Sequence, residues 1–207
     1  MELRELWQHH LRHTRNKTRR TLPSLHHEHL DSSTQRHRRL QSRGRIVTPG
    51  ACIIGLDVSE RRVGFAILEY DSGVCVSTGV MHTPAGDDLN TRVQAWHTIS
   101  HTANLTGDIE LVLIEAPWSG PNRQGSIRGA MAVGNLAGIC ASSLGRTILI
   151  DTIQPTQWRS LCGISTRGKE PVAEWANKVL GRTVTQDEAD ALGIATAAHH
   201  IAWKQAR

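Results

Sequence analysis

The sequence 53-IIGLDVSERRVGFAILE-69 contains two apolar runs joined by a polar turn. The first run, Ile53–Leu56, predicts a buried strand, and Val63–Leu68 predicts the strand onto which the chain turns back. Asp57 directly follows the first run. Because a buried carboxylate is costly unless its charge is compensated, Asp57 is either a ligand of a divalent cation or the start of a turn in which it accepts backbone N–H groups. This stretch alone is consistent with both.

The chain divides into two regions of different composition. Residues 1–50 contain 11 Lys and Arg against 4 Asp and Glu, with 7 of the 12 His, whereas residues 51–207 contain 13 basic and 15 acidic residues. The first region has too few apolar residues to offset the entropy of ordering. We therefore predict a basic, largely disordered tail over 1–50 and one folded domain over 51–207. The tail is an extension without a role, an arm that binds phosphates or an organelle transit segment.

The sequence argues against a membrane, secreted or zinc-ribbon protein. No apolar run is long enough to span a membrane, and no apolar segment typical of a secretory signal opens the chain. The four cysteines are widely spaced and never form a C-x-x-C pair, which argues against a zinc ribbon and a disulfide framework. We expect a cytoplasmic protein with no membrane partner, with organelle targeting by the tail left open.

Local patterns predict a mixed α/β fold with five strands and the order of elements βββαβαβαα. After the opening hairpin we expect a strand over 74–80, a helix from 84–88 to Gly107, a strand over 110–115, a helix over 126–144, a strand over 147–150, a polar segment over 151–168, and helices over 171–181 and 185–203. The helix over 126–144 carries a stripe of small residues, which suits packing against the sheet or a subunit interface. This stripe consists of Ala130, Gly134, Gly138 and Ala141.

Acidic residues recur at the ends of these elements. Glu115 ends the fourth strand, and Asp187 and Asp190 lie three residues apart on one face of the last helix. Glu188 completes a capping box, which leaves the two aspartates for chemistry. If the first and fourth strands are neighbours and the last helix packs across them, these carboxylates converge with Asp57. Such a cluster repels itself without cations, and two Mg²⁺ ions between carboxylates form the arrangement that cleaves phosphodiesters.

The pattern resembles the RuvC-type Holliday-junction resolvases of the RNase H-like superfamily. The resemblance covers about residues 51–203 and implies an RNase H-like fold and a homodimeric, bacterial or phage-type endonuclease. It implies hydrolysis of opposed strands of a four-way DNA junction with two Mg²⁺ per active site, or Mn²⁺ in their place. The matching segments are the opening hairpin with Asp57, VLIEAPWSG with Glu115, GAMAVGNLAG in the following helix and DEADALGIATAAHH with Asp187 and Asp190.

The resemblance also implies which residues contact DNA. Trp118 falls where the family places an aromatic residue that wedges between bases at the junction centre, a role that suits a stacking side chain. Arg159 and Lys169 resemble the family's phosphate-binding basic residues, and Lys169 can also balance charge in the transition state. Arg123, in the segment after Trp118, is a further phosphate-binding candidate.

Several alternatives stay open or are set aside. Within the nuclease class, the chain could act on other branched or flapped DNA or on RNA–DNA hybrids, and a catalytically silent relative would bind branched DNA only. The string Asp187-Glu-Ala-Asp190 also occurs in helicases, but no Gly-rich phosphate loop ending in Gly-Lys-Ser/Thr accompanies it. An actin-like nucleotide-binding module would need two domains. We therefore expect no nucleotide cofactor.

Overall fold

The computed structural model describes residues 50–59, 61–82, 89–104, 107–117, 123–143, 148–165 and 168–205. The predicted tail lies outside this part of the chain, apart from Gly50. The elements in chain order are β1 (Cys52–Val58), β2 (Arg62–Glu69), β3 (Cys75–His82), α3 (Leu89–Asn104), β4 (Ile109–Glu115), α4 (Arg123–Ser143), β5 (Leu149–Ile153), α5 (Pro155–Leu161), α6 (Glu170–Leu180) and α7 (Gln186–Gln205).

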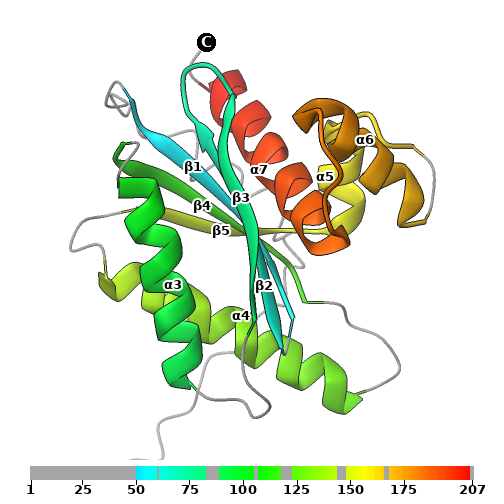
Figure 1. Ribbon diagram of the computed structural model, residues 1–207. Helices are drawn as coiled ribbons and strands as arrows, with labels where there is room; N and C mark the ends of the chain where they lie inside the picture. Colours follow the sequence, from blue (N-terminus) through cyan, green and yellow to red (C-terminus); the bar gives the residue numbers. More distant parts are fainter. Residues whose placement is uncertain are drawn as a thin grey trace, which may run out of the picture. The chain divides into compact units, whose positions relative to one another are not determined.

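The strands form one mixed sheet in the order β3-β2-β1-β4-β5 (Figure 1). The pairs β1–β2 and β2–β3 are antiparallel, and the pairs β1–β4 and β4–β5 are parallel. The predicted five-stranded mixed sheet, with an antiparallel edge and parallel crossovers, is therefore confirmed. β1 lies at the centre, and its residues 52–56 are all buried.

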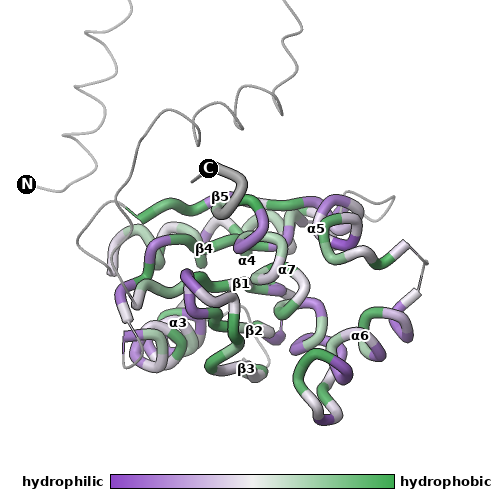
Figure 2. Tube along the Cα trace, turned by 90° about the horizontal axis from the view of Figure 1, so that it is seen from above, coloured by the Kyte–Doolittle hydropathy of each residue, from purple (hydrophilic) through white to green (hydrophobic). Residues whose placement is uncertain are grey.

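Helices cover both faces of the sheet. In Figure 1, α3 and α4 lie on one side, and α7 lies on the other with α5 and α6. Alternate residues of a strand point to opposite faces, and Ile53 accordingly packs in the cluster under α7 while Ile54 packs in the cluster under α3 and α4. Both cores draw on the central strands, which explains their continuous apolar runs; Figure 2 shows these strands as largely hydrophobic between the helices.

The region between β4 and α6 differs from its prediction. β5 ends at Ile153 rather than at 150, and a helix, α5, occupies part of the segment predicted to be an irregular polar stretch. Pro155 suits the first turn of this helix, and the side-chain oxygen of Gln157 accepts a hydrogen bond from the Gln154 N–H at 3.1 Å. Trp158 is the one fully buried residue of α5 and anchors it to the core.

The stripe of small residues on α4 does not pack against the sheet. All four residues of the stripe are exposed, and α4 instead buries Ala132, Val133, Leu136 and Cys140. The packing interpretation of the stripe is therefore wrong, and the subunit interface stays a prediction. Among the described residues, no helix is both long and apolar enough to cross a membrane.

Candidate active site

Asp57 and Glu115 lie side by side near the C-terminal ends of the neighbouring inner strands β1 and β4. The parallel register pairs Leu56 of β1 with Ile114 of β4, and each carboxylate is one residue further along its strand. Glu115 continues the row of Leu111 and Leu113, which faces α7. The expectation that the first and fourth strands are neighbours is confirmed, and both side chains point toward the last helix.

Two glycines allow α7 to lie directly on β1 and β2. A Cβ atom at Gly55 would overlap the backbone of Ala191 and Ala195, and one at Gly64 would overlap the backbone of Asp187. Only glycine permits such a close approach of backbone to backbone. The contact brings the first turns of α7, with Asp187 and Asp190, over the strand ends that carry the other two acids.

Glu188, between the two aspartates, has a structural role. Its carboxylate accepts hydrogen bonds from the backbone N–H and the hydroxyl of Thr185, both at 3.0 Å, and pairs with Arg182 at 2.9 Å. These contacts cap α7 and turn Glu188 away from the other acids. The predicted capping role of Glu188 is confirmed, and the catalytic role of the two aspartates stays a prediction.

The pKa values show that the acids share one electrostatic site. Burial, followed by repulsion from Asp190 and Asp187, raises the pKa of Asp57 to about 7. Burial, followed by repulsion from Asp57 and Asp190, raises the pKa of Glu115 to about 8. Burial also raises the pKa of Asp190, although a hydrogen bond from Gln186 opposes the shift. Burial, reinforced by repulsion among the acids, therefore disfavours the charged forms of these carboxyl groups.

Basic and amide side chains compensate part of this charge. Arg62 pairs with Asp187 at 3.1 Å, and Gln186 donates to Asp190 at 3.0 Å. Arg159 lowers the pKa of Glu115 and of Asp190, and Lys169 lowers that of Asp57 and of Asp190. Two of the three basic residues predicted to bind phosphate, Arg159 and Lys169, are thus near enough to the acids to favour their charged forms. Arg159 is held by a hydrogen bond to the carbonyl of Gly168, at 2.9 Å.

The donor set suits a divalent cation in its chemistry. Carboxylate oxygens are the ligands that Mg²⁺ and Mn²⁺ prefer, and a cation would relieve the repulsion that raises these pKa values. In the described ranges, however, no three Asp, Glu, His or Cys side chains surround one point closely enough to hold a metal ion. Arg62 and Gln186 each occupy an oxygen of an α7 aspartate instead. Cation binding therefore stays a prediction, although the types of the residues present suit a divalent cation.

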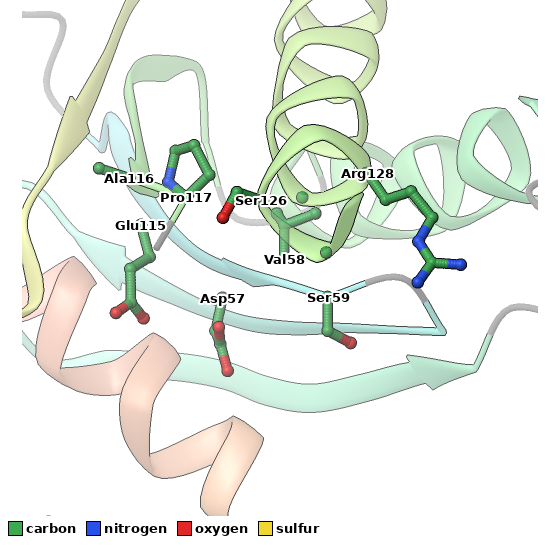
Figure 3. A pocket seen from close by; sticks show the side chains of 10 residues that line it. Asp57, Val58, Ser59, Glu115, Ala116, Pro117, Ser126 and Arg128 are labelled. Atoms are coloured by element: carbon green, nitrogen blue, oxygen red, sulfur yellow. The ribbon is translucent and has the colours of Figure 1, made fainter. Parts of the chain in front are cut away.

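A cavity of about 390 Å³ adjoins Asp57 and Glu115. In Figure 3 the two carboxylates lie side by side, Ser126 reaches toward them from α4, and Arg128 lies beyond Ser59. Ser59, Ser126 and Arg128 were not among the site residues predicted from the sequence. The only available signal was their position directly after β1 or in the first turns of a helix. The remaining walls are Val58, Ala116, Pro117, Gly125 and Gly129.

The cavity does not account for all of the predicted DNA contacts. Arg123 is exposed at the first residue of α4 and does not line the cavity. Trp118 lies outside the described residues, so its predicted stacking role stays a prediction. Arg128, one turn further along α4 than Arg123, is the arginine that α4 places at the cavity.

Known structures share this fold. Thermus thermophilus RuvC superposes with a TM-score of 0.58 at 18% identity, covering 74% of this chain and 97% of that chain. The same protein in complex with a Holliday junction substrate gives 0.56 at 19%, covering 72% and 94%. The yeast mitochondrial Holliday junction resolvase Ydc2 gives 0.55 at 10%, covering 83% and 86%. No protein-family model and no curated protein matches the chain. The predicted RuvC-type, RNase H-like fold is confirmed.

Proposed function

We propose that this chain is a metal-dependent endonuclease that resolves four-way DNA junctions by hydrolysing phosphodiesters in opposed strands. The observation that carries the proposal is the placement of Asp57 and Glu115 side by side at the ends of β1 and β4, under the first turns of α7 with Asp187 and Asp190. The likeness to RuvC in complex with a Holliday junction substrate supports the choice of DNA substrate.

Two Mg²⁺ ions, or Mn²⁺ in their place, would be held by these four carboxylates. When bound, such ions activate the attacking water and stabilise the leaving oxygen of an in-line displacement. The raised pKa values of Asp57 and Glu115 support this assignment, because a bound cation would offset the burial and repulsion that disfavour the charged forms of these carboxylates.

The chain's own residues would hold the DNA strand across the acids. The cavity beside Asp57 and Glu115 offers room for the strand, with Ser126 and Arg128 on the α4 side. Arg159 and Lys169 stand on the side of α5 and α6. Phosphates on both sides of the scissile bond would thus contact a basic side chain. Such contacts position the strand without reading its sequence.

A homodimer would match the two-fold symmetry of a four-way junction, which needs two cuts in opposed strands. The exposed stripe on α4 offers a contact surface, because its small residues lie beside exposed Ile127 and Met131. In each protomer, Trp118 would stack on bases near the crossover.

The test uses the full chain, purified, with Mg²⁺ on a synthetic four-way junction, a flap, a duplex and an RNA–DNA hybrid. We expect paired nicks in opposed strands of the junction and none after chelation of the metal. Preferential cutting of the flap or the hybrid would assign the chain to another branch of the nuclease class. Junction binding without cleavage, with Mg²⁺ or Mn²⁺, would overturn the proposed activity.

A further inference from the structure

Trp158 of α5 is fully buried next to the site. Its ring lies against Gly193 of α7, where a Cβ atom would come within 2.5 Å of the ring carbon Cζ3. Gly193 follows Asp190 by three residues, which is just under one helical turn. The absence of a side chain at position 193 therefore lets the indole pack on α7 within a turn of a predicted catalytic aspartate.

The indole shares an apolar cluster with residues that flank Glu115. Trp158 belongs to one buried cluster with Leu113 and Ile153. Leu113 precedes Glu115 by two residues on the same face of β4, and Ile153 is the residue of β5 that pairs with Glu115. The cluster that holds the indole therefore reaches both neighbours of Glu115, along its strand and across the sheet.

The indole N–H of Trp158 is buried and makes no hydrogen bond in the structure. An indole nitrogen is a donor only, so a buried one without an acceptor is costly. Glu115 offers an acceptor, and Trp158 already lowers the pKa of this carboxyl group. The N–H therefore lies close enough to Glu115 to favour its charged form but falls short of hydrogen-bond geometry.

We propose that Trp158 is a positioning residue for Glu115, and that its indole N–H donates to the Glu115 carboxylate in the cation-bound protein. This inference rests on the proposed function, because it assigns Glu115 as a metal ligand. Glu115 ends a strand, and a donor on one carboxylate oxygen would restrict how the group turns. Partners of this kind orient metal ligands, and their removal typically weakens metal binding or activity 10–100-fold.

Trp96 provides a matched control. It is also fully buried, and its indole N–H also lacks an acceptor in the structure. It belongs to the core on the other face of the sheet, with Ile54 and Ile99. Trp96→Phe and Trp158→Phe therefore each remove one buried indole N–H and keep an aromatic ring, but only the second change lies beside a carboxylate of the site.

The first measurement is Mn²⁺ binding to the full chain without DNA, by titration calorimetry. We expect Trp158→Phe to weaken Mn²⁺ binding about tenfold or more, and Trp96→Phe to change it less than about twofold. Equal binding by Trp158→Phe and the unmodified chain, or equal losses in the two variants, would overturn the inference alone. Failure of the unmodified chain to bind Mn²⁺ would overturn the proposed function and the inference with it.

The second measurement does not require Trp158→Phe to fold. The ¹⁵N-labelled indole signals of Trp158 and Trp96 are followed in the otherwise unmodified chain, before and after Mg²⁺ is added, and in Glu115→Ala. We expect Mg²⁺ to shift the Trp158 signal in the unmodified chain and to leave it in place in Glu115→Ala, while the Trp96 signal stays in place in both. A Trp158 signal that Mg²⁺ leaves in place in the unmodified chain, or shifts equally in Glu115→Ala, would contradict the proposed hydrogen bond.

Discussion

Gly64 of β2 lies directly against the backbone of Asp187 in α7. A Cβ atom at position 64 would overlap the Asp187 carbonyl oxygen and lie 2.8 Å from its carbonyl carbon. Two residues earlier on the same strand, Arg62 pairs with the Asp187 carboxylate. β2 therefore fixes the position of Asp187 in two ways: Gly64 leaves room for its backbone, and Arg62 pairs with its carboxylate.

Gly64→Ala should consequently displace the start of α7. We expect cleavage to fall at least about tenfold, since a small misplacement of catalytic groups has large effects, with a lower Tm. The matched control is Gly79→Ala on β3, where the new methyl group would meet the edge of the Phe65 ring rather than backbone atoms. Junction cleavage by Gly64→Ala at the level of Gly79→Ala would show that the contact with Asp187 is not needed.

The four acids provide the direct test of the chemistry. Asp57→Asn, Glu115→Gln, Asp187→Asn and Asp190→Asn should each lower cleavage at least about 10²-fold, while junction binding persists because removal of an acid reduces repulsion of phosphate. Glu188→Gln is the control in the same helix. It should lower stability through the lost cap, by about 1 kcal/mol, and leave the rate of cleavage at saturating protein nearly unchanged. Full activity of Asp57→Asn would refute the assignment.

The strand ends and their acids could be predicted because the signal is local. A carboxylate at the end of a buried apolar run, as at Asp57 and Glu115, is visible within a few residues of sequence. The face shared by Asp187 and Asp190 follows from helical spacing alone. The bounds of the strands were accurate to a few residues for the same reason.

The contacts that bring the acids together could not be predicted. Gly55 and Gly64 meet residues more than 120 positions away, and no local pattern marks a glycine as the site of such a contact. α5 has only 7 residues, too few for an apolar period, so Trp158 gave no sign of its burial. The cavity wall from α4, including Arg128, depends on how that helix lies against the strand ends.

The α4 stripe predicts an effect on assembly. Met131, 54% exposed, lies next to the stripe, and Met131→Glu would place a charge in the proposed interface. Val179 on α6 is 53% exposed, which makes Val179→Glu a matched control. We expect a dimer mass by light scattering for the unmodified chain and for Val179→Glu, and a monomer for Met131→Glu, with unpaired nicks in junctions. A monomeric unmodified chain, with or without junction, would refute the dimer.

The basic tail predicts an effect of salt. If the tail binds phosphates, each released counterion steepens the log–log dependence of duplex affinity on salt by about 0.9. Deletion of residues 1–46 should then weaken binding to junction and duplex alike and flatten this slope. Cleavage at saturating protein should hardly change, because all four acids follow the tail. An unchanged slope would support an extension without a role, and a lost junction preference would show that the tail recognises DNA structure.

The buried acids predict an unusual dependence of stability on pH in the metal-free chain. The pKa of Asp57 rises from 3.8 to about 7 on folding, and that of Glu115 from 4.5 to about 8. A carboxyl group with a higher pKa in the folded state binds its proton more tightly there, so these groups reduce stability as pH rises. Their effect is absent below about pH 4 and complete above about pH 8.

Glu188 has the opposite effect on the pH dependence of stability. Burial raises its pKa, but hydrogen bonds from Thr185 and Arg182 outweigh burial and lower it. The stability that Glu188 contributes is therefore present above its unfolded pKa and lost on acidification. The same change of carboxylate to amide should thus act in opposite directions at Asp57 and at Glu188.

Thermal unfolding with a chelator, at pH 5.5 and pH 8.5, measures both effects. Asp57→Asn should raise the Tm more at pH 8.5 than at pH 5.5, and the difference corresponds to at most about 2 kcal/mol, given about 1.4 kcal/mol for each pH unit between 5.5 and the folded pKa. Glu188→Gln should lower the Tm at pH 8.5. Saturating Mg²⁺ should stabilise the unmodified chain more than Asp57→Asn at pH 8.5. If Asp57→Asn lowered the Tm there, Asp57 would be favourably compensated without a cation, and the electrostatic argument for a metal site would fail.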